Sequence, residues 1–146
     1  MKAVVARASI EIAAPPYAVW AALTEPDQIK RYMFGSMVDT DWQPGSPITW
    51  SGVYNGNPYQ DKGEVVAIEP PHRLVLTHFS PMTGAADVPD NYHRLDYTLT
   101  PVEGGTLLDL SQDNNPDESA AAHATANWES MLAGLKHHIE GRIRER

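Results

Sequence analysis

Alternation of apolar and polar side chains begins at the start of the chain and returns over most of residues 36–114. In residues 3–13, Val5, Ile10 and Ile12 alternate with polar neighbours such as Ser9 and Glu11. A period of two residues is typical of a half-buried strand. The same pattern, broken by turn residues, predicts six further strands, over residues 38–42, 48–54, 59–69, 72–79, 92–102 and 106–114.

Two short helices are predicted between the first strand and the others. Pro15 and Pro16 suit a first helical turn, where the missing N–H costs nothing, and the apolar face that follows includes Trp20. Thr24 and Asp27 resemble a capping box, which places a second helix over residues 25–34 with Gly35 at its end. This second helix would bury Ile29, Met33 and Phe34.

The last segment predicts one long helix. Asn115, Pro116 and Glu118 supply a cap, a first-turn proline and a back-bonding acid. Apolar residues then recur at three- and four-residue spacing, at Ala124, Trp128, Met131, Leu132, Leu135, Ile139 and Ile143. A stripe of this length needs an equally long partner surface, and only the sheet is large enough.

These elements predict an α+β fold in one domain over residues 1–146. Its order is strand, two helices, an antiparallel meander of about six strands, and a long C-terminal helix packed on the concave face of the sheet. A chain of 146 residues can bury a core of its own.

Composition and charge exclude several classes of partner and of catalytic chemistry. The formal net charge of −8 argues against a nucleic-acid partner, and the lack of cysteine excludes disulfides and thiolate chemistry. We expect no membrane span, no signal peptide and a cytoplasmic location, because no apolar run approaches the required length. No P-loop, dinucleotide fingerprint or Ser-His-Asp order is present, and we expect no cofactor.

Polar residues are predicted on the concave face of the sheet. If residues 80–90 form the loop of a hairpin with His78 opposite His93, then Tyr97 falls on the same face, and Gln112 joins it on the next strand. Polar groups among aromatic rings are typical of a binding site. Both histidines could orient a ligand or act as acid and base. We predict no metal site, because Asp113 has the wrong parity to supply a third ligand.

Three tryptophans, Trp20, Trp50 and Trp128, belong to elements that would converge on this face. An indole N–H prefers a partner, so three of them suit the wall of a cavity for a flat or apolar ligand, although they could instead fill the core. Trp42 falls near a strand end and is expected at the rim or surface. The complete set of candidate ligand-binding residues is Trp20, Phe34, Trp50, Tyr54, His78, His93, Tyr97, Gln112, Trp128 and Met131.

Several short motifs resemble one known family. The opening of residues 14–26 follows the pattern "AP…VW.ALT.P", and later motifs are Pro44-Gly45, Gly63-Glu64-Val65, Glu69-Pro70-Pro71 with Arg73-Leu74, and Asn127-Trp128-Glu129 with Leu132 and Leu135. Over residues 8–140 the chain resembles the activator of heat-shock-protein-90 ATPase homologue, C-terminal-domain-like family, of the START-like (SRPBCC) superfamily. It departs from that pattern at Asn127, where the family often has Gly, and at Phe34, where Trp is common.

The resemblance implies a helix-grip fold and three possible functions. The first is binding of a small hydrophobic or aromatic molecule between sheet and helix. The second is a cyclase or dehydratase with His78, His93 or Tyr97 as acid or base. The third, a chaperone regulator with a role in the stress response, is the weakest, because the chaperone-activating members carry an additional N-terminal domain for which we expect no room. A homodimer could form through sheet edges or exposed aromatic residues.

Overall fold

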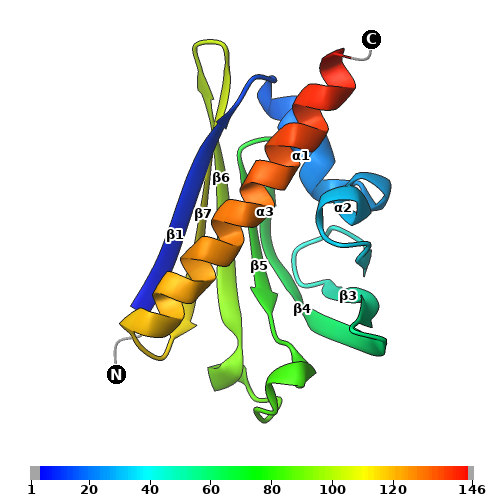
Figure 1. The fold of residues 1–146 in the computed structure, drawn as a ribbon, viewed down its shortest axis with the longest axis vertical. Helices are drawn as coiled ribbons and strands as arrows, with labels where there is room; N and C mark the ends of the chain where they lie inside the picture. The colour runs from blue at the N-terminus through cyan, green and yellow to red at the C-terminus, as the bar shows by residue number, and fades with distance from the viewer. Residues whose placement is uncertain (1–3, 145–146) are drawn as a thin grey trace.

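A seven-stranded antiparallel sheet curves around a long C-terminal helix in the computed structural model, which describes residues 4–144 (Figure 1). The helices are α1 (Pro16–Thr24), α2 (Pro26–Tyr32) and α3 (Glu118–Arg144), with short 3₁₀ turns η1 (Pro81–Thr83) and η2 (Pro89–Asn91). The strands are β1 (Val4–Ile12), β2 (Met37–Thr40), β3 (Pro47–Tyr54), β4 (Asn57–Glu69), β5 (Arg73–His78), β6 (His93–Val102) and β7 (Gly105–Asn115). Residue 3 of the predicted first strand and the side chain of Ile143 lie outside what the structure describes.

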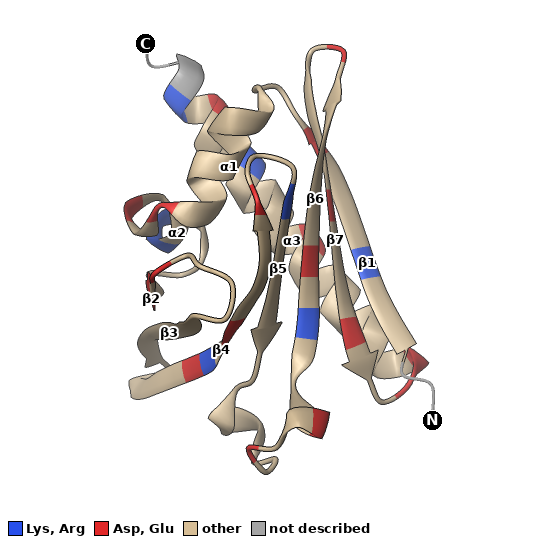
Figure 2. Ribbon diagram, turned by 180° about the vertical axis from the view of Figure 1, so that it is seen from behind, with Lys and Arg blue, Asp and Glu red and all other residues tan. Residues whose placement is uncertain are grey.

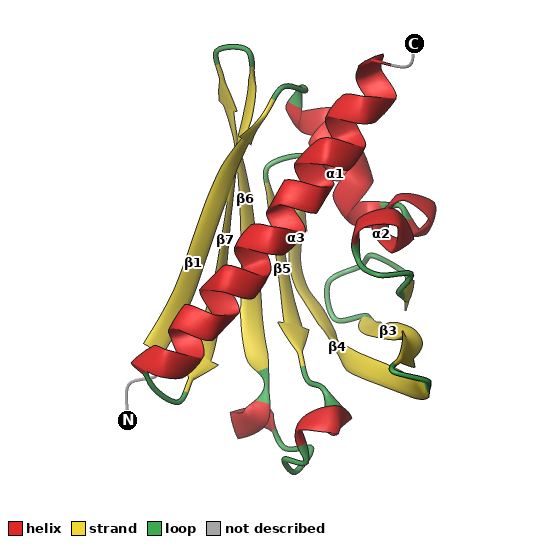
Figure 3. Ribbon diagram, viewed as in Figure 1, coloured by secondary structure: helices red, strands yellow, loops and turns green. Residues whose placement is uncertain are grey.

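The sheet order is β1-β7-β6-β5-β4-β3-β2, so strands β2 to β7 form the predicted six-stranded meander and β1 returns to pair with β7. Strands β1 and β2 are the two edges. Helix α3 runs diagonally across the concave face, and α1 and α2 lie beside its C-terminal half (Figure 3). The predicted helix-grip fold is therefore confirmed.

The core forms where α3 meets the sheet. Leu132, Leu135 and Ile139 of α3 are buried against inward leucines of β5, β6 and β7, such as Leu108. The opposite face of the sheet carries Lys, Arg, Asp and Glu along its strands (Figure 2). Apolar residues toward the helix and charged residues toward the outside are what the alternation predicts.

The predicted register of the central hairpin is confirmed. His78 lies opposite His93, and Leu74 lies opposite Tyr97. Gln112 is paired with Leu95 on the neighbouring strand, as its assigned face requires.

Strand β4 approaches β5 closely at Gly63. A Cβ atom on this residue would lie 1.8 Å from the carbonyl oxygen of Thr77, so only glycine fits there. The ladder between β4 and β5 is also irregular between Val65 and Ala67, and Lys62 bridges to Phe79 instead. This close approach sets the half of β4 that contains Asp61 beside the end of β5.

Two helix caps differ from their prediction. The Thr24 hydroxyl donates back to the carbonyl oxygen of Trp20 and does not cap α2. At α3, Asp117 accepts from the backbone N–H of Ala120 at 2.8 Å, while Asn115 is buried at the end of β7 and donates to the carbonyl oxygen of Val4. The Thr24 and Asn115 side chains each donate to a nearby backbone carbonyl oxygen. As helix caps they would only accept, and their own donors would be left unused.

The end of α2 also differs. The helix stops at Tyr32, and Phe34 adopts a left-handed φ of 55° before Gly35 at 80°. Gly35 closes the helix as predicted, with its N–H donating to the carbonyl oxygen of Lys30. The prediction that Phe34 is buried was wrong, since its side chain is 93% exposed, because the left-handed turn directs it away from the face that α2 packs.

Trp42 is the reverse case. It follows β2, as its placement near a strand end requires, but it is half-buried and packs against the hydrophobic core. This partial burial contradicts a surface position and leaves the rim position as the one that fits.

Candidate ligand-binding cavity

A cavity of about 510 Å³ opens at the end of the sheet where β3, β4 and β5 bend away from α3. Its wall is mainly apolar, with two methionines, Met33 and Met82, and with Leu95 on β6. Six aromatic residues complete most of the lining: Phe34, Trp50, Tyr54, Tyr59, Tyr97 and Trp128.

The sequence of α3 accounts for open space beside this cavity, in an adjoining chamber that Ala120 and Ala124 line. Residues 119–127 are mostly alanine and other small residues, whereas the second half of the helix presents Leu132, Leu135 and Ile139. The C-terminal half is held to β1, because Glu140 accepts from the N–H of Ala13 at 2.9 Å and Lys136 donates to the carbonyl oxygen of Glu11. Large side chains therefore fill the space under the C-terminal half of α3, and small side chains leave space unfilled at its N-terminal half.

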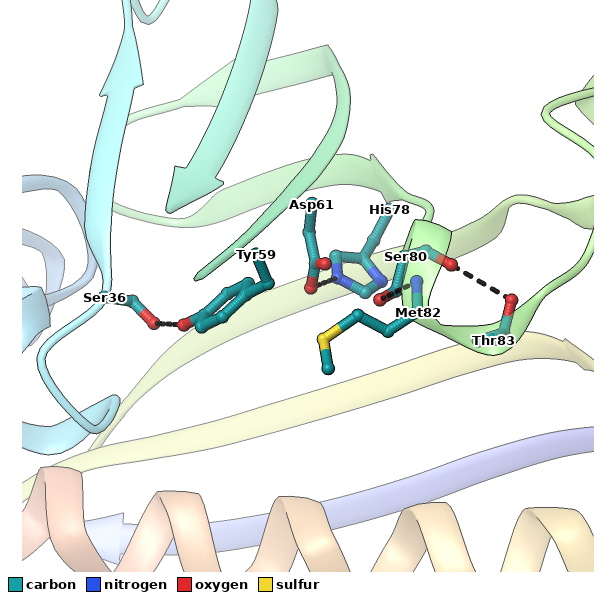
Figure 4. Close-up of polar contacts among 7 residues, drawn as sticks. All are labelled: Ser36, Tyr59, Asp61, His78, Ser80, Met82 and Thr83. Atoms are coloured by element: carbon teal, nitrogen blue, oxygen red, sulfur yellow. Dashed lines mark hydrogen bonds and ion pairs between the residues drawn. The ribbon is translucent and has the colours of Figure 1, made fainter. Parts of the chain in front are cut away.

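The charged group in the cavity wall is Asp61 of β4, which faces inward on the same side as Tyr59 and Val65. His78 Nε2 donates to Asp61 Oδ2 at 2.9 Å (Figure 4). The imidazole also meets the indole of Trp50 edge-on, with ring centroids 5.1 Å apart. These contacts fix the orientation of the imidazole at the cavity wall.

The second carboxylate oxygen has no partner. Asp61 Oδ1 is buried and accepts no hydrogen bond from any residue between 4 and 144. A buried carboxylate oxygen without a donor is costly, because it loses its water and gains nothing in return.

Two tyrosines supply hydroxyl groups. The Tyr59 hydroxyl and the buried Ser36 hydroxyl share a hydrogen bond at 2.6 Å, which links β4 to the segment after α2 (Figure 4). Burial raises the pKa of the Tyr97 hydroxyl above its usual value, so this group stays protonated. Within residues 4–144 the Tyr97 hydroxyl has no hydrogen-bond partner.

A second chamber of about 710 Å³ adjoins the first, and the two share Met33, Phe34 and Trp128 in their walls. The indole N–H of Trp128 donates to Gln112 Oε1 at 2.6 Å, which holds the ring between the chambers. His93 lines this second chamber and donates from Nδ1 to the carbonyl oxygen of Asp113 at 2.8 Å.

The structure brings most of the predicted site residues together, but in two groups. Phe34, Trp50, Tyr54, His78, Tyr97 and Trp128 line the first chamber. His93, Gln112 and Met131 line the second chamber, so the two histidines face different spaces. Trp20 lines neither chamber, because α1 turns it toward the core, where it is half-buried.

Sequence reasoning missed Asp61, Tyr59 and Ser36. Parity along β4 could have found the first two, since Tyr59, Asp61, Gly63 and Val65 alternate on one face. Ser36 carries no such signal. The residues that the structure describes hold no cluster of three His, Asp or Glu that could bind a metal.

The family model described as activator of Hsp90 ATPase homolog 1-like protein matches residues 13–140. No curated protein matches the sequence.

Among solved structures, a Cytophaga hutchinsonii protein is 41% identical with a TM-score of 0.87 and covers 99% of each chain. A Mesorhizobium loti protein is 25% identical with a TM-score of 0.75, covering 94% of this chain and 97% of its own. The Aha1 dimer of Colwellia psychrerythraea is 23% identical with a TM-score of 0.74, covers 94% of this chain and 96% of its own, and is a likeness of fold.

Proposed function

The chain belongs to the family of activator of Hsp90 ATPase homolog 1-like proteins, and from this premise we propose that it binds a small hydrophobic or aromatic molecule between its curved sheet and α3. Proteins of this START-like fold commonly bind hydrophobic ligands.

The observation that supports the proposal is the open, aromatic-lined chamber. Trp50 and Trp128 stand in its wall and leave about 510 Å³ unfilled. Ligand sites of drug-sized molecules measure roughly 300 to 1,000 Å³ and are lined mainly by apolar and aromatic groups. A chamber of this size and lining suits a flat apolar molecule.

The test is titration with N-phenylnaphthylamine, a neutral probe whose fluorescence rises in apolar surroundings. We expect saturable binding that Leu95→Trp removes, because the larger side chain fills the chamber from its back wall. Trp20→Phe is the matched control and should leave binding unchanged, since Trp20 lines neither chamber. Met82→Trp, at the exposed mouth, replaces Leu95→Trp if that variant fails to fold. Binding that is indifferent to both filling variants would contradict the proposal.

One observation favours a second function, an enzyme of the cyclase or dehydratase kind. His78 is oriented by Asp61, and a ring held by a carboxylate is the usual arrangement of a general base. His78→Ala separates the two functions, because a binder should retain most of its probe affinity while an enzyme should lose turnover. Retained turnover in that variant would exclude His78 as the base.

A homodimer is a further proposal. Met37 on edge strand β2 is 56% exposed and Val5 on edge strand β1 is 40% exposed, and unpaired sheet edges readily pair with a second copy. Analytical ultracentrifugation should give twice the chain mass, and Met37→Lys should reduce it toward one chain. A single-chain mass for the unmodified protein would contradict this.

We propose a cytoplasmic location, to be checked by cell fractionation; among residues 4–144 no helix has the length and apolar character of a membrane span. For the weakest function, chaperone regulation in the stress response, we expect no rise in Hsp90 ATPase rate when the chain is added in trans. A reproducible rise would overturn that expectation.

A further inference from the structure

The charge of the first chamber is unbalanced. Thirteen residues line it, and none is lysine or arginine, although one of them is Asp61. Lys62, the next residue along β4, faces the opposite side of the strand and pairs with Asp87 there. The whole chain carries a formal net charge of −8, so its distant charges add no compensating positive potential.

His78 does not supply the missing charge when its ring is neutral. A carboxylate only accepts, so Nε2 carries the proton in the bond to Asp61 Oδ2. In the neutral ring Nδ1 is then an acceptor, and it has no partner within residues 4–144. Two acceptors of the wall thus lack a donor from the described residues: Asp61 Oδ1, which is buried, and Nδ1 of a neutral His78, whose side chain is 27% exposed.

Aromatic rings line the same chamber as these acceptors, and the Trp50 ring meets the His78 ring edge-on. Trp50, Tyr59 and Tyr97 line the chamber together with Asp61. The faces of aromatic rings attract cations, most strongly where water is excluded. A carboxylate among aromatic rings, with no basic side chain in the wall, is the combination that selects an ammonium group.

The exposure of the lining side chains also increases from the interior of the first chamber to its mouth. Asp61 has a side chain 17% exposed, whereas Phe34, Val53, Tyr54 and Met82 at the mouth are all more than half exposed. A ligand with its polar group inward and its apolar body outward would match both ends.

We propose that the ligand of this chamber is a hydrophobic amine, whose protonated nitrogen is bound by Asp61 and the neighbouring aromatic rings while its apolar body fills the mouth. The inference rests on the proposed binding function and names the chemical class of the ligand. Its nitrogen gives Asp61 a counter-charge in a wall that contains no lysine or arginine. A carboxylic acid of the same shape is repelled, and an alcohol gains one hydrogen bond without the charge.

The test is calorimetry near neutral pH with three probes of one shape: naphthylethylamine, naphthylethanol and naphthylacetic acid. We expect the amine to bind at least about tenfold more tightly than the alcohol, and the acid most weakly. Equal affinities for amine and alcohol would overturn the inference and leave the proposed function standing. Binding of none of the probes, together with no binding of N-phenylnaphthylamine, would overturn the proposed function itself.

Two carboxylate variants test whether Asp61 is the source of the preference for the amine. Asp61→Asn should remove the advantage of the amine and keep the affinity for the alcohol. Asp87→Asn, which removes a carboxylate outside the chamber, should change neither. If Asp61→Asn does not fold, the ranking of the three probes on the unmodified protein still decides. A tenfold advantage that persists in a folded Asp61→Asn variant would contradict the role given to Asp61.

Discussion

His78 and Asp61 are bonded through Nε2 and Oδ2 at 2.9 Å although they belong to different strands and are seventeen residues apart. The bond exists because β4 passes close to β5 at Gly63, where a Cβ atom would meet the carbonyl oxygen of Thr77 at 1.8 Å. A backbone approach that only glycine permits therefore sets the geometry of the polar end of the chamber.

Gly63→Ala tests that dependence. The added methyl group cannot fit without moving β4 from β5, so we expect a loss of at least about 2 kcal/mol in the free energy of unfolding by urea. We also expect the His78 ring resonances to shift, because the contact with Asp61 opens. A variant as stable as the original, with unchanged resonances, would show that the strands tolerate the separation.

Gly134→Ala should have the opposite effect. This glycine lies in the middle of α3, and the nearest atom to an added Cβ would be Tyr32 Cβ at 3.8 Å, an ordinary contact. Alanine restricts the unfolded chain and favours the helix, so we expect a gain of roughly 0.5 to 1 kcal/mol in unfolding free energy. The same denaturation experiment compares both glycines, and a loss of stability at Gly134 would mean that α3 sits closer to α2 than described.

The fold was predictable because its pattern is regular. Alternation fixes which face each strand buries, and once His78 was set opposite His93 the rest of that hairpin had one register. The predictions failed where a local hydrogen bond or backbone turn overrides the pattern. Asn115 donates to Val4 instead of capping a helix, and Phe34 follows a left-handed turn.

The candidate site was harder to predict than the fold. Trp50 and Trp128 could be assigned to the concave face, but whether they fill it depends on how far α3 stands from the sheet. Asp61 was missed because a charged residue is normally assigned to the outer face, although its parity with Tyr59 and Val65 places it inward. Local departures of this kind concentrate at functional sites, and Asp61 is the strongest one in the described chain.

Trp128→Phe should loosen the wall between the two chambers. The change removes the indole N–H and leaves Gln112 Oε1 without its 2.6 Å partner, so we expect a loss of about 1 to 2 kcal/mol in unfolding free energy. Gln112→Met removes the other partner. A double-mutant cycle by urea denaturation should give a coupling of about 1 kcal/mol, and strict additivity would show that the bond contributes nothing.

His138 should make stability depend on pH. Burial first, and then Arg142 and Arg31, lower the pKa of His138 below its usual value near 6.5. Its ring also faces Gln28 Oε1 and the ring of Tyr32. The unfolded chain therefore binds this proton more readily than the folded chain, so stability falls as pH drops from about 6.5 to the lowered folded pKa.

The measurement is the thermal midpoint above and below that window, with His138→Gln as the variant. We expect the variant to lose less stability on acidification than the original chain does. His72→Gln, at the exposed turn between β4 and β5, is the control and should keep the original pH dependence. If both variants lose the same amount of thermal stability on acidification, the proton responsible binds at another residue.

Tyr97→Phe separates the binding role of the chamber from a catalytic one. The Tyr97 side chain is mostly buried, burial raises the pKa of its hydroxyl, and no group in residues 4–144 bonds to that hydroxyl. Because the hydroxyl makes no hydrogen bond within the described residues and lines the open chamber, its removal should change the free energy of unfolding by less than about 1 kcal/mol. Affinity for N-phenylnaphthylamine should also hold, because the ring and its apolar surface remain.

A fall in stability of more than about 1 kcal/mol would mean that the hydroxyl has a partner in solution. Unchanged probe affinity combined with lost turnover would identify Tyr97 as an acid and favour the enzyme over the binder.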